Sequence, residues 1–186
     1  RTESANQVKI TQFGEFDGSK ILKSAFGKNA GFSNIEYIDL DFGGGIIQAM
    51  ESSGDRLFVF AAHQLAIINV AQDIEFLEAQ LPNMGVDGHR CVAKVGEGLA
   101  WVNDNGVHLF DGEQVKTISD EKMRTAGLAN QAIVYWPKDK LIIAWKDTNE
   151  AYAYSLITKT WVSHMPTLAN VPETNSVPLA DGSTVF

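Results

Sequence analysis

Four histidines are the side chains of this chain best suited to acid–base chemistry. They are His63, His89, His108 and His164, and they lie far apart in the sequence. No Ser, Cys or carboxylate recurs beside them in the arrangement that orients a general base. Scattered histidines on strands usually find hydrogen bonds within the fold or face solvent. The sequence therefore predicts no catalytic residue among them.

Cys91 is the only cysteine, so no disulfide can form within the chain. A reactive thiol needs basic neighbours, and His89 and Arg90 are adjacent to it. Side chains at successive strand positions point to opposite faces, however, which separates the thiol from its immediate neighbour. We therefore expect Cys91 to fill space inside an apolar strand.

Two short polar strings could be taken for ligand sites. Gly43-Gly44-Gly45 precedes a predicted strand, whereas a phosphate-binding glycine loop precedes a helix. The string Asn103-Asp104-Asn105-Gly106 has a single acidic residue and no Glu at the offset that a calcium loop needs. Both strings are typical of backbone turns. We expect no cofactor and no metal ion.

The elements that would position these side chains follow a regular spacing. Leu57, Leu99 and Leu141 stand 42 residues apart, and each begins an apolar segment after a polar turn. Asp181 continues the spacing, because it lies 42 residues after Asp139. A period in the low forties, made of strands and turns, is typical of a β-propeller blade.

Each unit divides into four predicted strands separated by turn residues. The strands are 46–50, 56–62, 65–70 and 74–79, then 89–95, 99–103, 107–111 and 114–119, then 131–137, 141–146, 151–156 and 160–163. The second strand of each unit is apolar at consecutive positions, which indicates burial on both faces, as in a blade between two others. The predicted fold is all-β: a propeller, or a propeller segment, of four-stranded antiparallel blades.

We expect residues 1–186 to form one propeller segment. Phe16-Asp17-Gly18 matches Phe110-Asp111-Gly112, which predicts that the chain opens on strands three and four of an earlier blade. The predicted blades are 1–26 (partial), 46–80, 89–119, 131–163 and 181–186 (the start of the next). An open arc would expose apolar blade faces. The missing initiator Met and the partial blades suggest that further residues complete the ring.

The longest predicted connections are the blade crossovers 27–45, 81–88, 120–130 and 164–177. Antiparallel order brings them to one end of the blades, where functional loops are expected. Residues 120–124 could form one helical turn. The expected partner-contact residues are Asn83, Met84, Met123, Arg124, Met165 and Asn170. The alternative is that their apolar members only hold the loops against the blades. We expect the opposite end, with its tight turns, to be mostly solvated.

Composition limits the partner classes. The chain has 15 Lys and Arg against 23 Asp and Glu, a net charge of −8, and 45% hydrophobic residues. Without a basic stripe, binding to a nucleic-acid backbone is disfavoured. The apolar runs are too short to cross a bilayer, so we expect a soluble chain with no membrane partner.

Several strings resemble a known family. They are NIEYIDLDFGGGIIQAM, DRLFVFAAHQLAIINV, GLAWVNDNGVHLFDGEQVKTIS, PKDKLIIAW and YSLITKTWV. Across most of residues 34–162 the chain resembles the β-propeller virion structural proteins of tailed bacteriophages, of the packaged-DNA stabilisation or neck and tail type. The resemblance implies a non-enzymatic virion component, made in the host cytoplasm, that assembles with other virion proteins in a multimer. The family has no catalytic residues, and its members are longer than this chain.

Other functions remain open on the sequence. A propeller can bind or degrade glycans, and carboxylates from several blades could pair at its axis. Clustered carboxylates with aromatic platforms at the axis would favour this alternative over the virion protein. A kelch-like or WD-like intracellular scaffold has a similar period. The absence of the Trp-Asp dipeptide weakens the WD version.

Overall fold

The computed structural model of the chain is almost purely β. It describes residues 8–9, 18–24, 32–71, 75–119, 132–147, 150–162, 177–178 and 184–185. The chain divides into two compact units, Arg1–Gly85 and Val86–Phe186. Every regular element of the described residues is a strand, apart from one turn of 3-10 helix. No helix in these ranges is long and apolar enough to cross a membrane.

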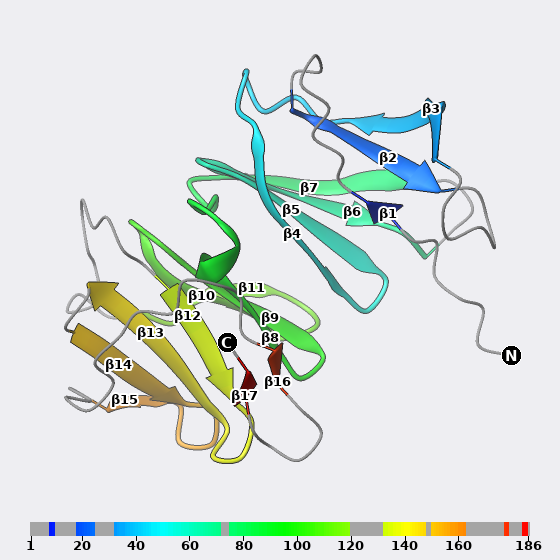
Figure 1. The fold of residues 1–186 in the computed structure, drawn as a ribbon. Helices are drawn as coiled ribbons and strands as arrows, with labels where there is room; N and C mark the ends of the chain where they lie inside the picture. The colour runs from blue at the N-terminus through cyan, green and yellow to red at the C-terminus, as the bar shows by residue number, and fades with distance from the viewer. Residues whose placement is uncertain are drawn as a thin grey trace, which may run out of the picture. The chain divides into compact units, whose positions relative to one another are not determined.

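The first unit opens with a three-stranded antiparallel sheet (Figure 1). Its order is β1 (Val8–Lys9), β2 (Lys20–Ser24) and β3 (Phe32–Asp39). The prediction of a connection over 27–45 is wrong, because β3 lies within it. The physical reason is that Ile38, near the end of β3, and Leu40, directly after it, pack into the core, while the adjacent Tyr37 is exposed.

The second sheet of this unit is a four-stranded antiparallel meander in the order β4-β5-β6-β7. Its strands are β4 (Ile47–Ser53), β5 (Arg56–Ala61), β6 (Gln64–Asn69) and β7 (Phe76–Pro82). Gly54 and Asp55 form the turn between β4 and β5, and Gly54 takes the positive φ of 56° that this tight turn requires. The four predicted strands of this unit are confirmed, with ends shifted by a few residues.

A shared core joins the two sheets of the first unit. Ile21 from the first sheet and Leu40, directly after β3, pack in one cluster with Leu57, Val59 and Ile68 from the second sheet. The alternate β5 residues, Phe58 and Phe60, are also fully buried. Strand β5 is thus buried on both faces, as its continuous apolar sequence predicts.

The second unit begins with a turn of 3-10 helix, η1 (His89–Cys91), where the sequence predicts a strand. Cys91 donates its N–H to the carbonyl of Gly88, which closes this turn. The four-stranded meander follows in the order β8-β9-β10-β11. Its strands are β8 (Val92–Val95), β9 (Gly98–Asn103), β10 (Gly106–Phe110) and β11 (Val115–Thr117).

A second four-stranded meander in this unit has the order β12-β13-β14-β15 (Figure 1). Its strands are β12 (Ala132–Trp136), β13 (Leu141–Asp147), β14 (Glu150–Ser155) and β15 (Thr160–Val162). Strand β12 lies against η1, β8 and β9. At the outer strands, the Trp161 Nε1–H donates a 2.6 Å hydrogen bond to the carbonyl of Ile118. The strands β16 (Val177–Pro178) and β17 (Thr184–Val185) form an antiparallel pair.

The three leucines that define the spacing do not share one environment. Leu57 is 6% exposed and Leu99 is fully buried, but Leu141 is only partly buried. The β12–β13 turn is the cause. Leu141 is the first residue of β13 and pairs with Trp136 across a four-residue turn, whereas Leu57 and Leu99 are second in their strands after two-residue turns. The 42-residue spacing predicts equivalent buried positions for the three leucines, and this prediction is wrong for Leu141.

We expect Gly106→Ala to lower the free energy of unfolding by about 1–3 kcal/mol, the usual range for overpacking. Gly106 has a φ of 125°, and a Cβ placed on it would overlap the Ser119 Oγ. The control is Gly96→Ala, at a φ of 61° with open space around the added methyl group. Urea denaturation of both variants separates overlap from backbone strain. An equal loss of stability in both variants would show that the Ser119 side chain moves aside at no cost.

Candidate partner-contact site

The connection after β7 carries the two expected contact residues that the structure describes. Asn83 is exposed and has a positive φ of 62°, which Asn tolerates better than most residues. Its backbone N–H donates a 2.7 Å hydrogen bond to the carbonyl of His63, in the β5–β6 turn. Met84 is half-buried. The backbone therefore holds Asn83 at the surface, while the Met84 side chain is only partly exposed to solvent.

Gly85 fixes the path of this connection. A Cβ at Gly85 would collide with the backbone of Ala61 and Ala62, so the chain passes them more closely than any side chain permits. The next residue, Val86, is 1% exposed. The close passage of Gly85 fixes the chain directly after its exposed residue Asn83, as a preformed contact surface requires.

An amide cluster, formed by Gln64, Gln80 and Asp41, borders the same end of the first unit. The Gln80 Nε2 donates to the carbonyl of Asp41 at 2.7 Å and to the Gln64 Oε1 at 2.8 Å. The Asp41 carboxylate accepts the N–H of Gly43 at 2.9 Å. The glycine string thus forms a backbone turn, as predicted. The Asp41 carboxylate stabilises this turn, and the amide cluster links it to β6 and β7. Sequence reasoning missed this cluster, because Gln80 and Asp41 are 39 residues apart.

The remaining expected contact residues are Met123, Arg124, Met165 and Asn170. They lie outside the described residues, as does the helical turn predicted for 120–124. The expectation that the crossovers 120–130 and 164–177 lie at the same end as Asn83 therefore stays a prediction.

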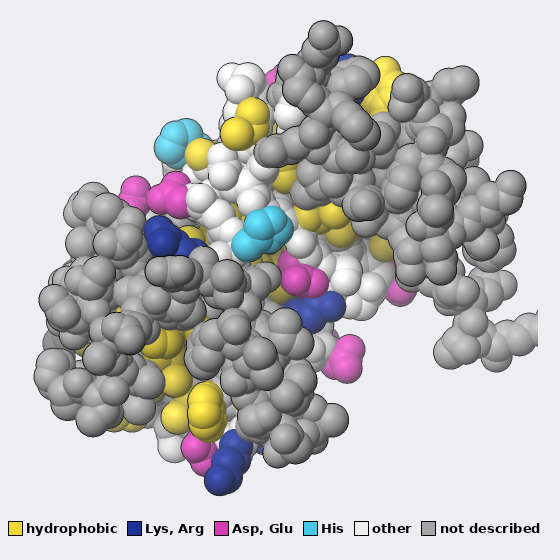
Figure 2. Space-filling model, in the orientation of Figure 1, with side chains coloured by type: hydrophobic (Ala, Val, Ile, Leu, Met, Phe, Trp, Pro, Cys, Tyr) yellow, Lys and Arg dark blue, Asp and Glu magenta, His cyan; other side chains and the backbone are white. Residues whose placement is uncertain are grey.

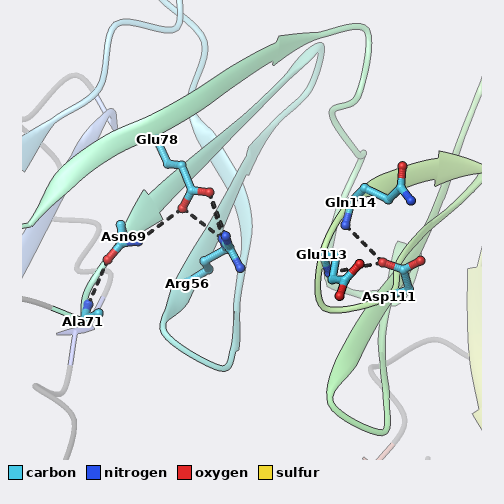
Figure 3. Close-up of polar contacts among 7 residues, drawn as sticks. All are labelled: Arg56, Asn69, Ala71, Glu78, Asp111, Glu113 and Gln114. Carbon is cyan, nitrogen blue, oxygen red and sulfur yellow. Dashed lines mark hydrogen bonds and ion pairs between the residues drawn. The ribbon is translucent and has the colours of Figure 1, made fainter.

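The other end of the second sheet carries an exposed ionic network (Figure 3). The Arg56 guanidinium binds the Glu78 carboxylate through Nε and a terminal nitrogen, at 2.9–3.0 Å. The Asn69 Nδ2 donates to the same carboxylate at 3.3 Å. Hydrogen bonding to Arg56 lowers the pKa of Glu78, and the same bond raises the pKa of Arg56. The network joins β5, β6 and β7 at the surface, where such pairs contribute little stability.

The Asp111 turn between β10 and β11 is organised by one carboxylate (Figure 3). Asp111 accepts the backbone N–H groups of Glu113 and Gln114 at 3.1 and 3.0 Å, and it pairs with the Lys116 ammonium. The bond from Lys116, together with the two backbone donors, holds the pKa of Asp111 well below its usual range. The carboxylate therefore stabilises the turn.

A pair of basic turns ends the last four-stranded sheet. Lys140 in the β12–β13 turn and Lys159 in the β14–β15 turn have φ values of 51° and 56°. The N–H of Leu156 donates to the carbonyl of Lys140 at 3.0 Å, which joins the two turns. Ile157, at the tip, is 70% exposed. Sequence reasoning expected a mostly solvated turn end and singled out none of these residues.

The structure describes three of the four histidines. His63 and His89 are exposed, and His164 lies outside the described residues. His108 is buried, with its ring nitrogens 3.0 Å from the Thr117 Oγ1 and 3.1 Å from the Asn103 Oδ1. Desolvation lowers the pKa of His108 to about 4.

Cys91 is fully buried, and burial raises the pKa of its thiol, so it remains protonated near neutral pH. Trp136 packs partly buried against the core of the last four-stranded sheet. In the ranges that the structure describes, no group of three or more His, Cys, Asp or Glu side chains could hold a metal ion. On the face drawn in Figure 2, charged side chains occur in small separate groups.

Comparison with known proteins gives no family for this chain: no family model matches it, and no curated protein is similar to it.

Proposed function

We propose that the sheets of this chain are blades of one β-propeller segment with a 42-residue repeat. Three consecutive four-stranded meanders support it, since each sheet is complete before the next begins. The second strands begin at Arg56, Gly98 and Leu141, close to a constant spacing. Burial also falls across each sheet, from the enclosed strands β5 and β9 to the exposed last strands β7 and β11. Radially arranged blades have this gradient.

We propose further that the segment is a non-enzymatic structural protein of a phage particle, at its neck or tail. The observation that carries this proposal is the burial of the second strands β5 and β9 along their length, which gives each unit a closely packed core beneath short connections. An adaptor held by large interfaces needs such a core. The resembling strings fall on these same elements, with DRLFVFAAHQLAIINV over β5 and β6 and GLAWVNDNGVHLFDG over β9 and β10.

The direct experiment is mass spectrometry of density-purified particles from a tailed phage that encodes this sequence. Peptides of the chain in fixed stoichiometry with the other virion proteins are expected. Their confinement to the unassembled lysate would overturn the proposal. Turnover of a bacterial polysaccharide that one carboxylate substitution abolishes would instead establish the alternative, a glycan-degrading propeller.

The contact role of the β7–β8 connection gives a separate prediction. We expect Asn83→Lys and Met84→Lys to reduce incorporation of the protein into particles by about tenfold, as for central interface residues. Lysine tolerates the conformation of Asn83, since Lys140 and Lys159 adopt it here. Quantitative immunoblotting of particles measures the effect.

The matched control is Glu97→Gln, an equal charge change in the exposed β8–β9 turn. We expect it to leave incorporation unchanged. Loss of incorporation for Glu97→Gln alone would place the interface at the end of the sheets where the tight β8–β9 turn lies.

A further inference from the structure

Two turns project from one end of the last four-stranded sheet. A row of paired residues crosses the sheet at this end: Trp136, Leu141, Ser155 and Thr160. The turn residues 137–140 and 156–159 lie beyond that row. The bond from the Leu156 N–H to the Lys140 carbonyl, at 3.0 Å, joins the two turns. We name this pair of turns the lysine tip.

The lysine tip combines an exposed apolar residue with unpaired cations. Ile157 is 70% exposed, the highest value among the exposed large apolar side chains of the described residues. Three exposed lysines share the two turns with it: Lys138, Lys140 and Lys159. Their ammonium groups make no ion pair with any described residue. Asp139 is the single acid of the two turns, so three lysines against one aspartate leave a net charge of +2.

The corresponding turns of the preceding sheet carry the opposite charge. The β8–β9 turn exposes Glu97. The β10–β11 turn exposes Glu113 and Asp111, and the Asp111 carboxylate pairs with Lys116. Neither turn holds an exposed large apolar side chain. The basic and apolar composition of the lysine tip is therefore not a general property of the turns in this fold.

We propose that the lysine tip binds the surface of an anionic lipid bilayer. Lysine ammonium groups are attracted to anionic headgroups, and the lysine stems can lie along the surface while the charges stay in water. Ile157 can enter the boundary between headgroups and acyl chains. The sequence predicts no membrane partner because no apolar run can cross a bilayer, but a contact with the bilayer surface needs no such run.

The apolar residue favours a bilayer over a soluble polyanion or a protein. A nucleic acid or a polyphosphate would pair with the lysines but would leave Ile157 in water. Each turn has four residues, whereas a standard protein interface involves about 20–30 residues on each side. Trp136, in the row at the base of the tip, and Trp161, directly after the row, are partly buried. Tryptophan is enriched at the level of the headgroups in membrane-bound proteins.

The net charge of −8 on the whole chain does not prevent this contact. At physiological salt, charges more than about 8 Å from the lipid are largely screened, so the charges of the tip itself dominate the attraction. Two net positive charges with one apolar anchor give weak and reversible binding, which requires an assay at about millimolar lipid. This inference goes beyond the proposed adaptor function and does not rest on it.

Binding of the purified chain to vesicles tests the proposal. The probes are vesicles of phosphatidylcholine alone, and of phosphatidylcholine with about one third phosphatidylglycerol. We expect the chain to sediment only with the anionic vesicles. Binding should weaken when NaCl rises from about 0.05 M to about 0.5 M, because salt screens the lysines. No binding to the anionic vesicles, or equal binding to both kinds, would overturn the proposal.

A charge variant that keeps the fold assigns the binding to the tip. Lys140→Asn/Lys159→Asn removes two charges, and Asn tolerates the φ values of 51° and 56° at these positions. We expect binding to weaken by at least about tenfold, since each lysine near an anionic surface contributes about fivefold. The control is Lys94→Gln, at an exposed lysine of the preceding sheet, and it should leave binding unchanged. A fivefold loss in the control would attribute the binding to overall charge and contradict the proposal.

A fluorescent label shows whether Ile157 enters the lipid. Ile157→Cys provides a single accessible thiol, because Cys91 is fully buried. A polarity-sensitive fluorophore at residue 157 should shift to shorter wavelength with anionic vesicles and should not shift with soluble polyphosphate. The control is the same label on Val162→Cys, at an exposed position of β15 beyond the row, where no shift is expected. No shift at residue 157, a shift at both positions, or an equal shift with polyphosphate would each refute the proposal.

Discussion

Leu99→Ala should lower the free energy of unfolding by about 2–5 kcal/mol, whereas Leu141→Ala should cost no more than about 1 kcal/mol. Leu99 is fully buried in β9, so its truncation leaves a cavity that the surrounding strands cannot fill. Leu141 stands at the start of β13 beside a four-residue turn and is only partly buried. Solvent and the turn can adjust to the smaller side chain there.

Urea denaturation of both variants measures this difference. Leu57→Ala, at a side chain that is 6% exposed, is the matched comparison and should resemble Leu99→Ala. Equal losses at Leu99 and Leu141 would show that the longer turn does not relax the packing of Leu141. That result would restore the expectation of three equivalent leucines.

The second large effect is acid destabilisation through His108. The pKa of His108 falls from 6.5 to about 4 in the folded chain because burial removes water from the ring. Between these values the unfolded state binds a proton that the folded state does not, so stability is lost as the pH falls from 6.5 towards 4. At about 1.4 kcal/mol per pKa unit, the loss is on the order of 3 kcal/mol.

The hydrogen bonds of His108 define which ring nitrogen carries the proton. The Asn103 Oδ1 already accepts the N–H of Asn105 at 2.8 Å, and an oxygen acceptor requires a donor from the ring. The Nε2 of His108 therefore donates to Asn103, and its Nδ1 accepts from the Thr117 hydroxyl. The neutral ring thus satisfies both partners in a buried site that does not solvate a positive charge.

Urea denaturation from pH 7 to pH 4 tests this assignment. His108→Gln should flatten the dependence of stability on pH in this range, whereas His63→Gln, at an exposed ring, should leave it unchanged. An identical dependence in His108→Gln and the unsubstituted chain would show that other groups cause the acid sensitivity.

Hairpins and buried strands were the predictable part of the fold. The turn at Asp104–Asn105 and the continuous apolar strand β5 follow from local residue types, and both are confirmed. Strand β3 was missed because glycines on both sides of it are typical of a connection. The 3-10 turn at His89–Cys91 was missed because it directly precedes the apolar strand β8 and was assigned to the start of that strand.

The candidate contact surfaces were less predictable, because they depend on tertiary neighbours. Asn83 was selected for its place in a connection, but its anchoring to His63 comes from the β5–β6 turn. The pairing of the two basic turns through Leu156 and Lys140 depends on how β13 and β14 end. Neither bond has a signature in the local sequence.

The meander order of the sheets also has a consequence for how the chain folds. In each of the three four-stranded sheets, every strand pairs with the strand next to it in the sequence. Such local pairings have low contact order, which favours fast formation of each sheet. During synthesis, β4 to β7 can pair before β12 has left the ribosome, so each sheet can be complete before the strands of the next one are all available.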